Sequence, residues 1–146
     1  MRETLFNWLG QNLAGKRCLD LFAGSGVLGL EAASRGAAEV VMVESNRKVF
    51  AALQASVQKF SDINVKLHCE DALKYLQRDS GKFDVIFLDP PFQKNILPEL
   101  LPTLMDKMND DSVVYIETGT VFEAGADWKI LKRARAGAVH YQLIKR

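Results

Sequence analysis

Residues 84–92 limit what this chain can fold into more than any other stretch. The run Asp-Val-Ile-Phe-Leu-Asp-Pro-Pro-Phe begins as an apolar strand and ends in Asp89, Pro90, Pro91 and Phe92. Because neither proline has an N–H group to donate, the chain must leave the sheet where Asp89 appears. The stretch therefore predicts a central strand that delivers a carboxylate, carbonyl groups and an aromatic ring to the edge where open α/β sheets bind ligands.

A glycine-rich loop is the second constraint, and it lies between an expected strand at 17–22 and an expected helix that ends near Gly36. It contains the candidate ligand-binding residues Asp20, Phe22, Gly24, Ser25 and Gly26. A strand that passes through such a loop into a helix brings backbone N–H groups, at the positive end of the helix, close to a ligand. The pattern predicts that a negatively charged group binds at this loop.

Acidic residues also close the next two expected strands, at 39–44 and 63–69. Glu44, followed by Ser45, lies 18 residues after Gly26, a spacing at which a carboxylate accepts hydrogen bonds from ribose hydroxyls. A solvated acid at a strand end is the competing interpretation. Asp71, followed by Ala72, has a second explanation as the N-cap of a helix, and the cap and ligand roles can coexist.

The remaining elements alternate between helix and strand. Expected helices cover 3–13, 46–60 and 97–108, a turn covers 109–111, and strands cover 112–117, 129–134 and 138–144, with the last two forming an antiparallel hairpin. This order predicts an α/β fold, a three-layer, doubly wound, Rossmann-like sheet.

Composition and charge narrow the class of protein. The 146 residues are 48% hydrophobic, which suits one domain over residues 1–146. The sequence has 19 Lys and Arg residues and 18 Asp and Glu residues, which give a formal net charge of +1. Nucleic-acid binding would therefore need a local basic patch. Basic residues do gather near the carboxyl terminus, although edge strands also carry lysine to resist aggregation. They are Lys129, Lys132, Arg133, Arg135, Lys145 and Arg146.

The cellular setting follows from what the sequence lacks. Cys18 and Cys69 show no C-x-x-C spacing, which indicates reduced, packed thiols and no metal site. The chain contains no apolar run of membrane-spanning length and no leader pattern, so we expect a soluble, cytoplasmic protein without membrane contact. We also expect a monomer.

The spacing of the glycines and acids alone fits either a nicotinamide dinucleotide or S-adenosylmethionine. The Asp-Pro-Pro-Phe corner favours methyl transfer to an exocyclic amine, whose lone pair is delocalised into the base. Acceptors on Asp89 and Pro90 can bind both amine hydrogens and turn the lone pair toward a methyl group. Phe92 can stack on the base. The corner therefore predicts S-adenosylmethionine as the cofactor.

At these residues the sequence resembles the class I S-adenosylmethionine-dependent methyltransferases, and more closely RsmD, the bacterial small-subunit ribosomal RNA guanine-N2 methyltransferase family. The resemblance rests on 2–9, 20–29 and 89–92 and covers nearly the whole chain. It implies a mostly parallel seven-stranded sheet with an antiparallel last strand. It also implies ribosomal RNA as the partner, either naked or within a small-subunit particle.

The resemblance assigns roles to individual residues as well. It implies that Asp20 and the glycines hold the methionine moiety, Glu44 the ribose, and Asp71 with Ala72 the adenine. In one respect the sequence departs from the family, whose members carry a basic segment before the first helix, whereas here Met1 directly precedes Arg2. Weak RNA binding is the expectation that follows.

Two other functions stay open at this point. A DNA adenine methyltransferase, or another amino-methyltransferase, would share the Asp-Pro-Pro-Phe corner. A non-catalytic protein of the same fold that binds the cofactor or RNA would be expected to have lost part of the loop or the corner, and this sequence keeps both.

Overall fold

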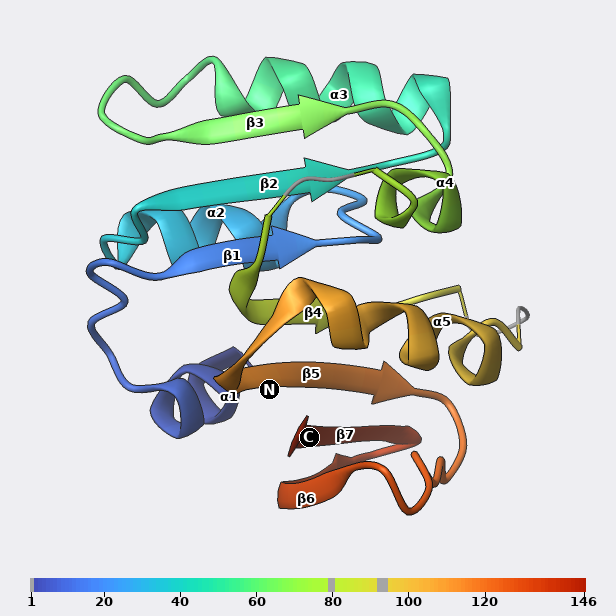
Figure 1. The fold of residues 1–146 in the computed structure, drawn as a ribbon. Helices are drawn as coiled ribbons and strands as arrows, with labels where there is room; N and C mark the ends of the chain where they lie inside the picture. Colours follow the sequence, from blue (N-terminus) through green and yellow to red (C-terminus); the bar gives the residue numbers. More distant parts are fainter. Residues whose placement is uncertain (1, 79–80, 92–94) are drawn as a thin grey trace.

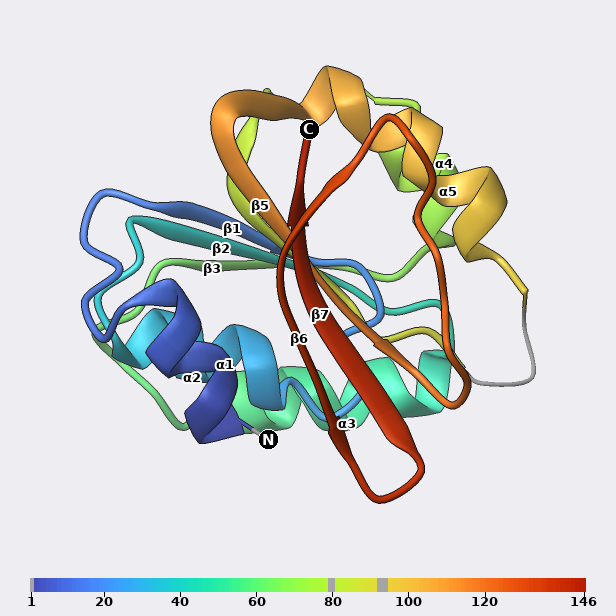
Figure 2. The same cartoon turned by 90° about the horizontal axis from the view of Figure 1, so that it is seen from below.

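A single seven-stranded sheet organises the protein, and helices cover both of its faces (Figures 1 and 2). The computed structural model describes residues 2–78, 81–91 and 95–146. The helices are α1 (Arg2–Leu9), α2 (Val27–Ser34), α3 (Arg47–Val57), α4 (Ala72–Leu76), α5 (Leu97–Leu104) and the 3₁₀ helix η1 (Met105–Lys107). The strands are β1 (Arg17–Asp20), β2 (Glu39–Val43), β3 (Val65–His68), β4 (Phe83–Leu88), β5 (Met108–Thr118), β6 (Lys129–Ala136) and β7 (Val139–Lys145).

The order of the strands across the sheet is β3-β2-β1-β4-β5-β7-β6. Strands β1 to β5 pair in parallel, and β7 runs antiparallel to both of its neighbours, β5 and β6. The arrowheads of β1 to β5 accordingly point the same way in Figure 1. The expected doubly wound sheet with an antiparallel last strand is thereby confirmed.

Two apolar cores fill the space between the sheet and its helices, and they use alternate residues of the same strands. Ile86 and Leu88 of β4 pack toward α4 and α5, whereas Val85 and Phe87 pack toward α1, α2 and α3. Figure 2 shows these two helical layers on opposite faces of the sheet. Because β4 is buried on both faces, its sequence is a continuous apolar run rather than an alternating one.

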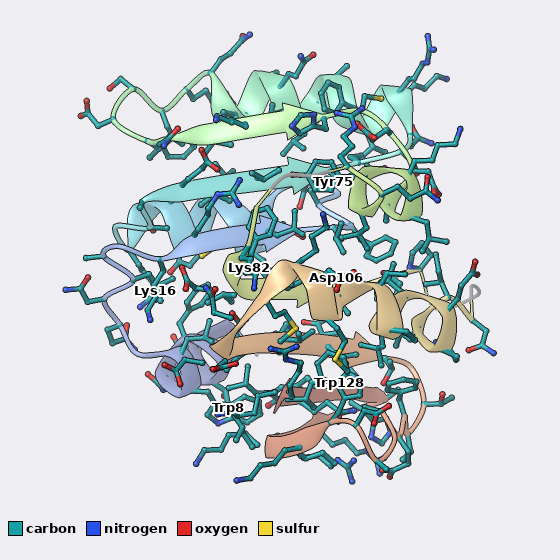
Figure 3. All side chains as sticks on the ribbon, viewed as in Figure 1. Trp8, Lys16, Tyr75, Lys82, Asp106 and Trp128 are labelled. Carbon is teal, nitrogen blue, oxygen red and sulfur yellow. The ribbon has the colours of Figure 1, made fainter. Side chains whose placement is uncertain are left out.

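The first helix is shorter than its apolar pattern predicts. The sequence predicted helix over 3–13, but α1 ends at Leu9, since Gly10 adopts a φ of 91° that a helix does not allow. Leu13 is nevertheless buried, as part of the following loop. Trp8 of α1 stacks on Tyr141 at 5.4 Å, and it lies beside the last two strands in Figure 3.

Two further expectations are corrected. Residues 109–111 do not form a separate turn but lie within β5, as a bulge of three extra residues between the Phe83–Met108 and Val85–Val113 pairs. Ser112 holds the bulge, because its hydroxyl accepts from the Asn109 N–H (2.8 Å) and donates to the Phe83 carbonyl (2.7 Å). Cys69, expected to be packed, is exposed, whereas Cys18 is buried.

Among the helices within the described ranges, none combines the length and the apolar composition needed to cross a bilayer.

Candidate active site

One cavity of about 730 Å³ opens at the carboxyl ends of the central parallel strands, and this volume lies in the usual range for ligand sites. It brings together most of the residues predicted from the sequence: Asp20, Phe22, Gly24, Ser25, Glu44, Ser45, Asp71, Ala72, Asp89, Pro90 and Pro91. Gly26 is not among the lining residues. Phe92 lies outside the described residues, so its stacking role stays a prediction.

The glycine loop between β1 and α2 owes its shape to two left-handed residues. Gly24 has a φ of 56° and Gly26, the N-cap of α2, a φ of 85°. A Cβ atom on Gly26 would lie 2.5 Å from Cδ1 of the buried Leu53, whereas one on Gly24 would meet nothing within 4 Å. Gly26 therefore shapes the loop by letting α2 and α3 approach, while Gly24 faces the cavity.

The protein's own carboxylates use the N–H groups of this loop. The Gly24 N–H donates to Glu44 Oε1 at 2.9 Å, and the Gly29 N–H, in the first turn of α2, donates to Asp20 Oδ2 at 3.2 Å. Acidic side chains therefore already bind two of the donors at this loop, and a negatively charged ligand group at the remaining N–H groups stays a prediction.

Acidic side chains dominate the cavity. They are Asp20, Glu44, Glu70, Asp71, Asp89 and Glu117, and no Lys, Arg or His belongs to the part of the lining that the structure describes. Such a wall attracts a cationic ligand and repels phosphate groups.

Asp20 is the most deeply buried of these acids, with 1% of its surface exposed. Burial raises its pKa to about 7, an effect that the Gly29 N–H opposes and that the charges of Asp89 and Glu44 reinforce. Within the described part of the chain, its Oδ1 atom has no hydrogen-bond partner. A buried carboxylate oxygen without a partner is costly, so this atom is a fitting acceptor for a cationic donor group in the cavity.

Asp89 and Glu117 lie beside each other in the same cavity. Leu88 and Ile116 are paired across β4 and β5, so the next residues, Asp89 and Glu117, follow on neighbouring strands and both line the cavity. Burial raises the pKa of Asp89 to about 7, and the negative charge of Glu117 and a hydrogen bond with its carboxyl group add to the increase. The phenol of Tyr115 donates to Glu117 Oε1 at 2.6 Å.

Glu117 and Glu70 were not predicted as site residues. A signal for Glu117 was present, because it closes an apolar strand just as Glu44 does, but no motif marks it. Glu70 lies beside the predicted Asp71 and binds Arg78 at 2.7 Å.

Two local predictions can be compared with the geometry of the loops. Asp71 caps α4 as predicted, because its Oδ2 accepts from the Leu73 N–H (3.1 Å) and the Lys74 N–H (3.2 Å). Glu44 holds the chain after β2, since its second oxygen accepts from the Asn46 N–H at 2.8 Å. Both carboxylates thus carry structural bonds while facing the cavity.

The strand order, the glycine loop and the acid-lined cavity over β1 and β4 together define a Rossmann-like domain of the methyltransferase class. Comparison with known proteins makes the assignment more specific. The chain belongs to the family described as Conserved hypothetical protein 95, which matches residues 1–145.

Relatives in this family match nearly all of the chain. Ribosomal RNA small subunit methyltransferase D of Escherichia coli (strain K12) is 35% identical over 153 residues, which are 100% of this chain and 76% of the relative. The protein of the same name from Haemophilus influenzae is 34% identical over 151 residues, which cover 98% and 78%. A conserved hypothetical protein of Streptococcus pyogenes has a solved structure with a TM-score of 0.90 at 33% identity, covering 100% of this chain and 95% of that one. The resemblance to the RsmD family is thereby confirmed.

Proposed function

We propose that this protein is an enzyme that methylates the exocyclic amine of a guanine in small-subunit ribosomal RNA, with S-adenosylmethionine as the methyl donor. The observation that carries the proposal is the cavity in which the glycine loop and the Asp89-Pro90 corner face one another. The relatives named ribosomal RNA small subunit methyltransferase D, which match 98% or more of the chain, support the substrate class.

The charge of the cavity favours S-adenosylmethionine over a nicotinamide dinucleotide. A dinucleotide would bring a pyrophosphate against six carboxylates, with no cation in the described lining to bind it. When bound, S-adenosylmethionine supplies an electrophilic methyl group on a positively charged sulfur. Asp20, through its free oxygen, would accept a hydrogen bond from the ammonium group, Glu44 from the ribose, and Asp71 with Ala72 would hold the adenine.

Asp89 and Pro90 would act on the target amine. The Asp89 carboxylate and the Pro90 carbonyl would each accept a hydrogen bond from one N–H of the amine. These two bonds would hold the nitrogen with its lone pair directed into the cavity. The amine must also lose a proton after it gains a methyl group. Because burial and Glu117 raise the pKa of Asp89 to about 7, its carboxylate can take up that proton near neutral pH.

We further propose that residues 1–146 act as one domain, as a monomer and in the cytoplasm, on naked ribosomal RNA or on a small-subunit particle. The single domain is supported by the two apolar cores, which share every central strand of one sheet.

Methyl transfer from tritiated S-adenosylmethionine to small-subunit particles, naked ribosomal RNA and DNA, measured side by side, tests the proposal. We expect label in one or both ribosomal substrates and none in DNA. Label in DNA alone would replace the proposal with a DNA amino-methyltransferase.

Calorimetry tests the cofactor separately. We expect S-adenosylmethionine and S-adenosylhomocysteine to bind and NAD to give no heat of binding. Tight NAD binding without S-adenosylhomocysteine binding would overturn the assignment.

A further inference from the structure

A second carboxylate lies beside Asp89, and the methyl transfer derived above leaves it without a direct contact to the substrate. Glu117 is the next-to-last residue of β5, Asp89 is the first residue after β4, and neighbouring strands in a sheet are about 4.8 Å apart. Both carboxyl groups line the cavity. The target base would therefore meet a pair of carboxylates rather than a single one.

We propose that Glu117 is a base-reading residue, which accepts a hydrogen bond from the N1–H of the target guanine while Asp89 and Pro90 hold its 2-amine. This inference rests on the proposed function and deepens it, because it names the residue that selects guanine. It also explains why the site would reject adenine, the target in the competing DNA methyltransferase.

The selection of guanine would depend on the hydrogen-bonding edges of the bases. Guanine presents two adjacent donors on its Watson–Crick edge, N1–H and the 2-amine, and a base turned out of its stack is read on that edge. Two carboxylates are acceptors and match both donors. Adenine presents a donor amine beside the N1 acceptor, so one carboxylate would face a lone pair and remain unpaired, which is the strongest basis for rejecting a ligand.

Tyr115 fixes which oxygen of Glu117 is available to the base. The ring of Tyr115 is fully buried between Phe87 and Tyr141, and its hydroxyl donates to Glu117 Oε1. Burial, followed by the charges of Glu117 and Asp89, raises the pKa of this phenol far above its usual value, so the hydroxyl remains a donor. Oε1 thus takes the bond from the phenol, and the N1–H of a bound guanine would replace the hydrogen bond that Glu117 makes with Asp89.

Hydrogen-bond acceptors surround the pair, and the described lining contributes no cation. Asp20 from β1 adds a third carboxylate near Asp89, and Tyr141 from β7 packs against Tyr115. A guanine that brings two donors is therefore the ligand that relieves this crowding of acceptors.

The test uses 2-aminopurine, a base that keeps the reactive 2-amine but has an N1 acceptor in place of the N1–H. The nucleotide that the wild-type protein methylates is first mapped in small-subunit ribosomal RNA. RNA is then made with guanine or 2-aminopurine at that position. Binding in the presence of S-adenosylhomocysteine is measured by 2-aminopurine fluorescence and by competition with the guanine RNA, so the readout does not require catalysis.

The Glu117→Gln variant supplies the matching change in the protein. Its amide oxygen keeps the bond from Tyr115, and its amide N–H₂ takes the position of Oε2 and can donate to N1 of 2-aminopurine. We expect the wild-type protein to prefer guanine by about tenfold or more, and Glu117→Gln to reduce or reverse that preference by about tenfold to a hundredfold. 2-Aminopurine also lacks the 6-oxygen of guanine, but this loss is the same for both proteins. Comparing the base preference of the wild-type protein with that of Glu117→Gln therefore cancels its effect.

Two more variants complete the design. Glu123→Gln removes the same charge at an exposed position outside the cavity, and we expect it to keep the wild-type preference. The double variant Tyr115→Phe/Glu117→Gln lacks the hydroxyl that holds the amide oxygen in place. We therefore expect its base preference to differ less from that of the wild-type protein than the preference of Glu117→Gln does.

Equal binding of the two RNAs by the wild-type protein would overturn the assignment without any variant. An identical preference in the wild-type protein and Glu117→Gln would also overturn it. If the wild-type protein labels no guanine in ribosomal RNA, the proposed function itself is wrong, and the assignment falls with it.

Discussion

Asp20 and Asp89 end neighbouring strands of the sheet, yet their carboxyl groups have different surroundings. Asp20 is closed off from solvent and keeps one oxygen without a described partner, whereas Asp89 is half-buried and shares its space with Glu117. Burial is the largest cause of the raised pKa in both. Burial beside like charges is typical of residues that work on a ligand rather than stabilise the fold.

Replacing Asp89 should separate cofactor binding from methyl transfer. We expect Asp89→Ala to lower the transfer rate by about a hundredfold or more, since a preorganised charged acceptor is lost from the reacting amine. The affinity for S-adenosylhomocysteine should stay nearly unchanged in calorimetry, which serves as the control for folding. A variant that keeps most of its rate would remove the role assigned to Asp89.

Cofactor binding should be coupled to the loss of a proton near neutral pH. The pKa of Asp20 is raised to about 7, and the charges that face it, on Asp89 and Glu44, are both negative. A cationic ligand favours the ionised carboxylate, so the affinity for S-adenosylmethionine should rise as pH increases through 7 and level off above it.

Calorimetry in two buffers of different ionisation enthalpy measures this coupling. We expect proton release at pH 7 for S-adenosylmethionine, less for S-adenosylhomocysteine, which lacks the sulfonium charge, and less in Asp20→Asn than in the wild-type protein. Equal proton release for both ligands and both proteins would show that Asp20 does not titrate with binding.

At the scale of elements, the turn from β1 into α2 provides a matched pair of substitutions. Both loop glycines have positive φ, but only Gly26 is in the path of another side chain, Cδ1 of Leu53. Gly26→Ala should therefore lower the free energy of unfolding by about 1–3 kcal/mol more than Gly24→Ala, because strain and overpacking combine. Urea denaturation of the two variants measures this difference. Equal losses in the free energy of unfolding would mean that α3, which carries Leu53, moves away from the added methyl group at little cost.

The sequence could predict those features of the fold that depend on residues close together in the chain. The strand-loop-helix order around Gly24 and the cap at Asp71 depend on neighbouring residues, and both are found in the structure. The bulge at 109–111 could not be predicted, since it depends on the pairing of β5 with Phe83, far away in sequence. Glu117 was missed because no motif marks it, although it ends an apolar run, and the register of β4 with β5 is what brings it to Asp89.

Across the whole molecule, acidic and basic side chains are nearly equal in number but gather in different places. The acid-lined cavity lies at the carboxyl ends of the central strands, and exposed basic residues lie along the edge strand β6. Arg135 of β6 is level with Thr118 of β5, through His140 of β7, and so lies at the same end of the sheet as the cavity. Lys129 lies at the other end of β6. The hairpin of β6 and β7 projects beyond the body of the sheet in Figure 2.

This arrangement predicts a position-dependent effect on RNA binding. Arg135→Gln should weaken RNA binding and lower the salt dependence by about one unit of slope, because a phosphate contact and its counterion release are lost. Lys129→Gln removes the same charge from the same strand and should have a smaller effect. Affinities measured against salt concentration for the three proteins check this, and equal effects would show that β6 contributes only general charge.

The central claim, methylation of a guanine amine, is tested most directly by identifying the methylated nucleoside. Small-subunit particles and naked ribosomal RNA are incubated with the protein and with S-adenosylmethionine that carries a deuterated methyl group, and the RNA is digested to nucleosides for mass spectrometry. We expect label in N2-methylguanosine, and about a hundredfold less label or lower when Asp89→Ala replaces the wild-type protein. Label in N6-methyladenosine, or in a guanosine methylated at another atom, would contradict it.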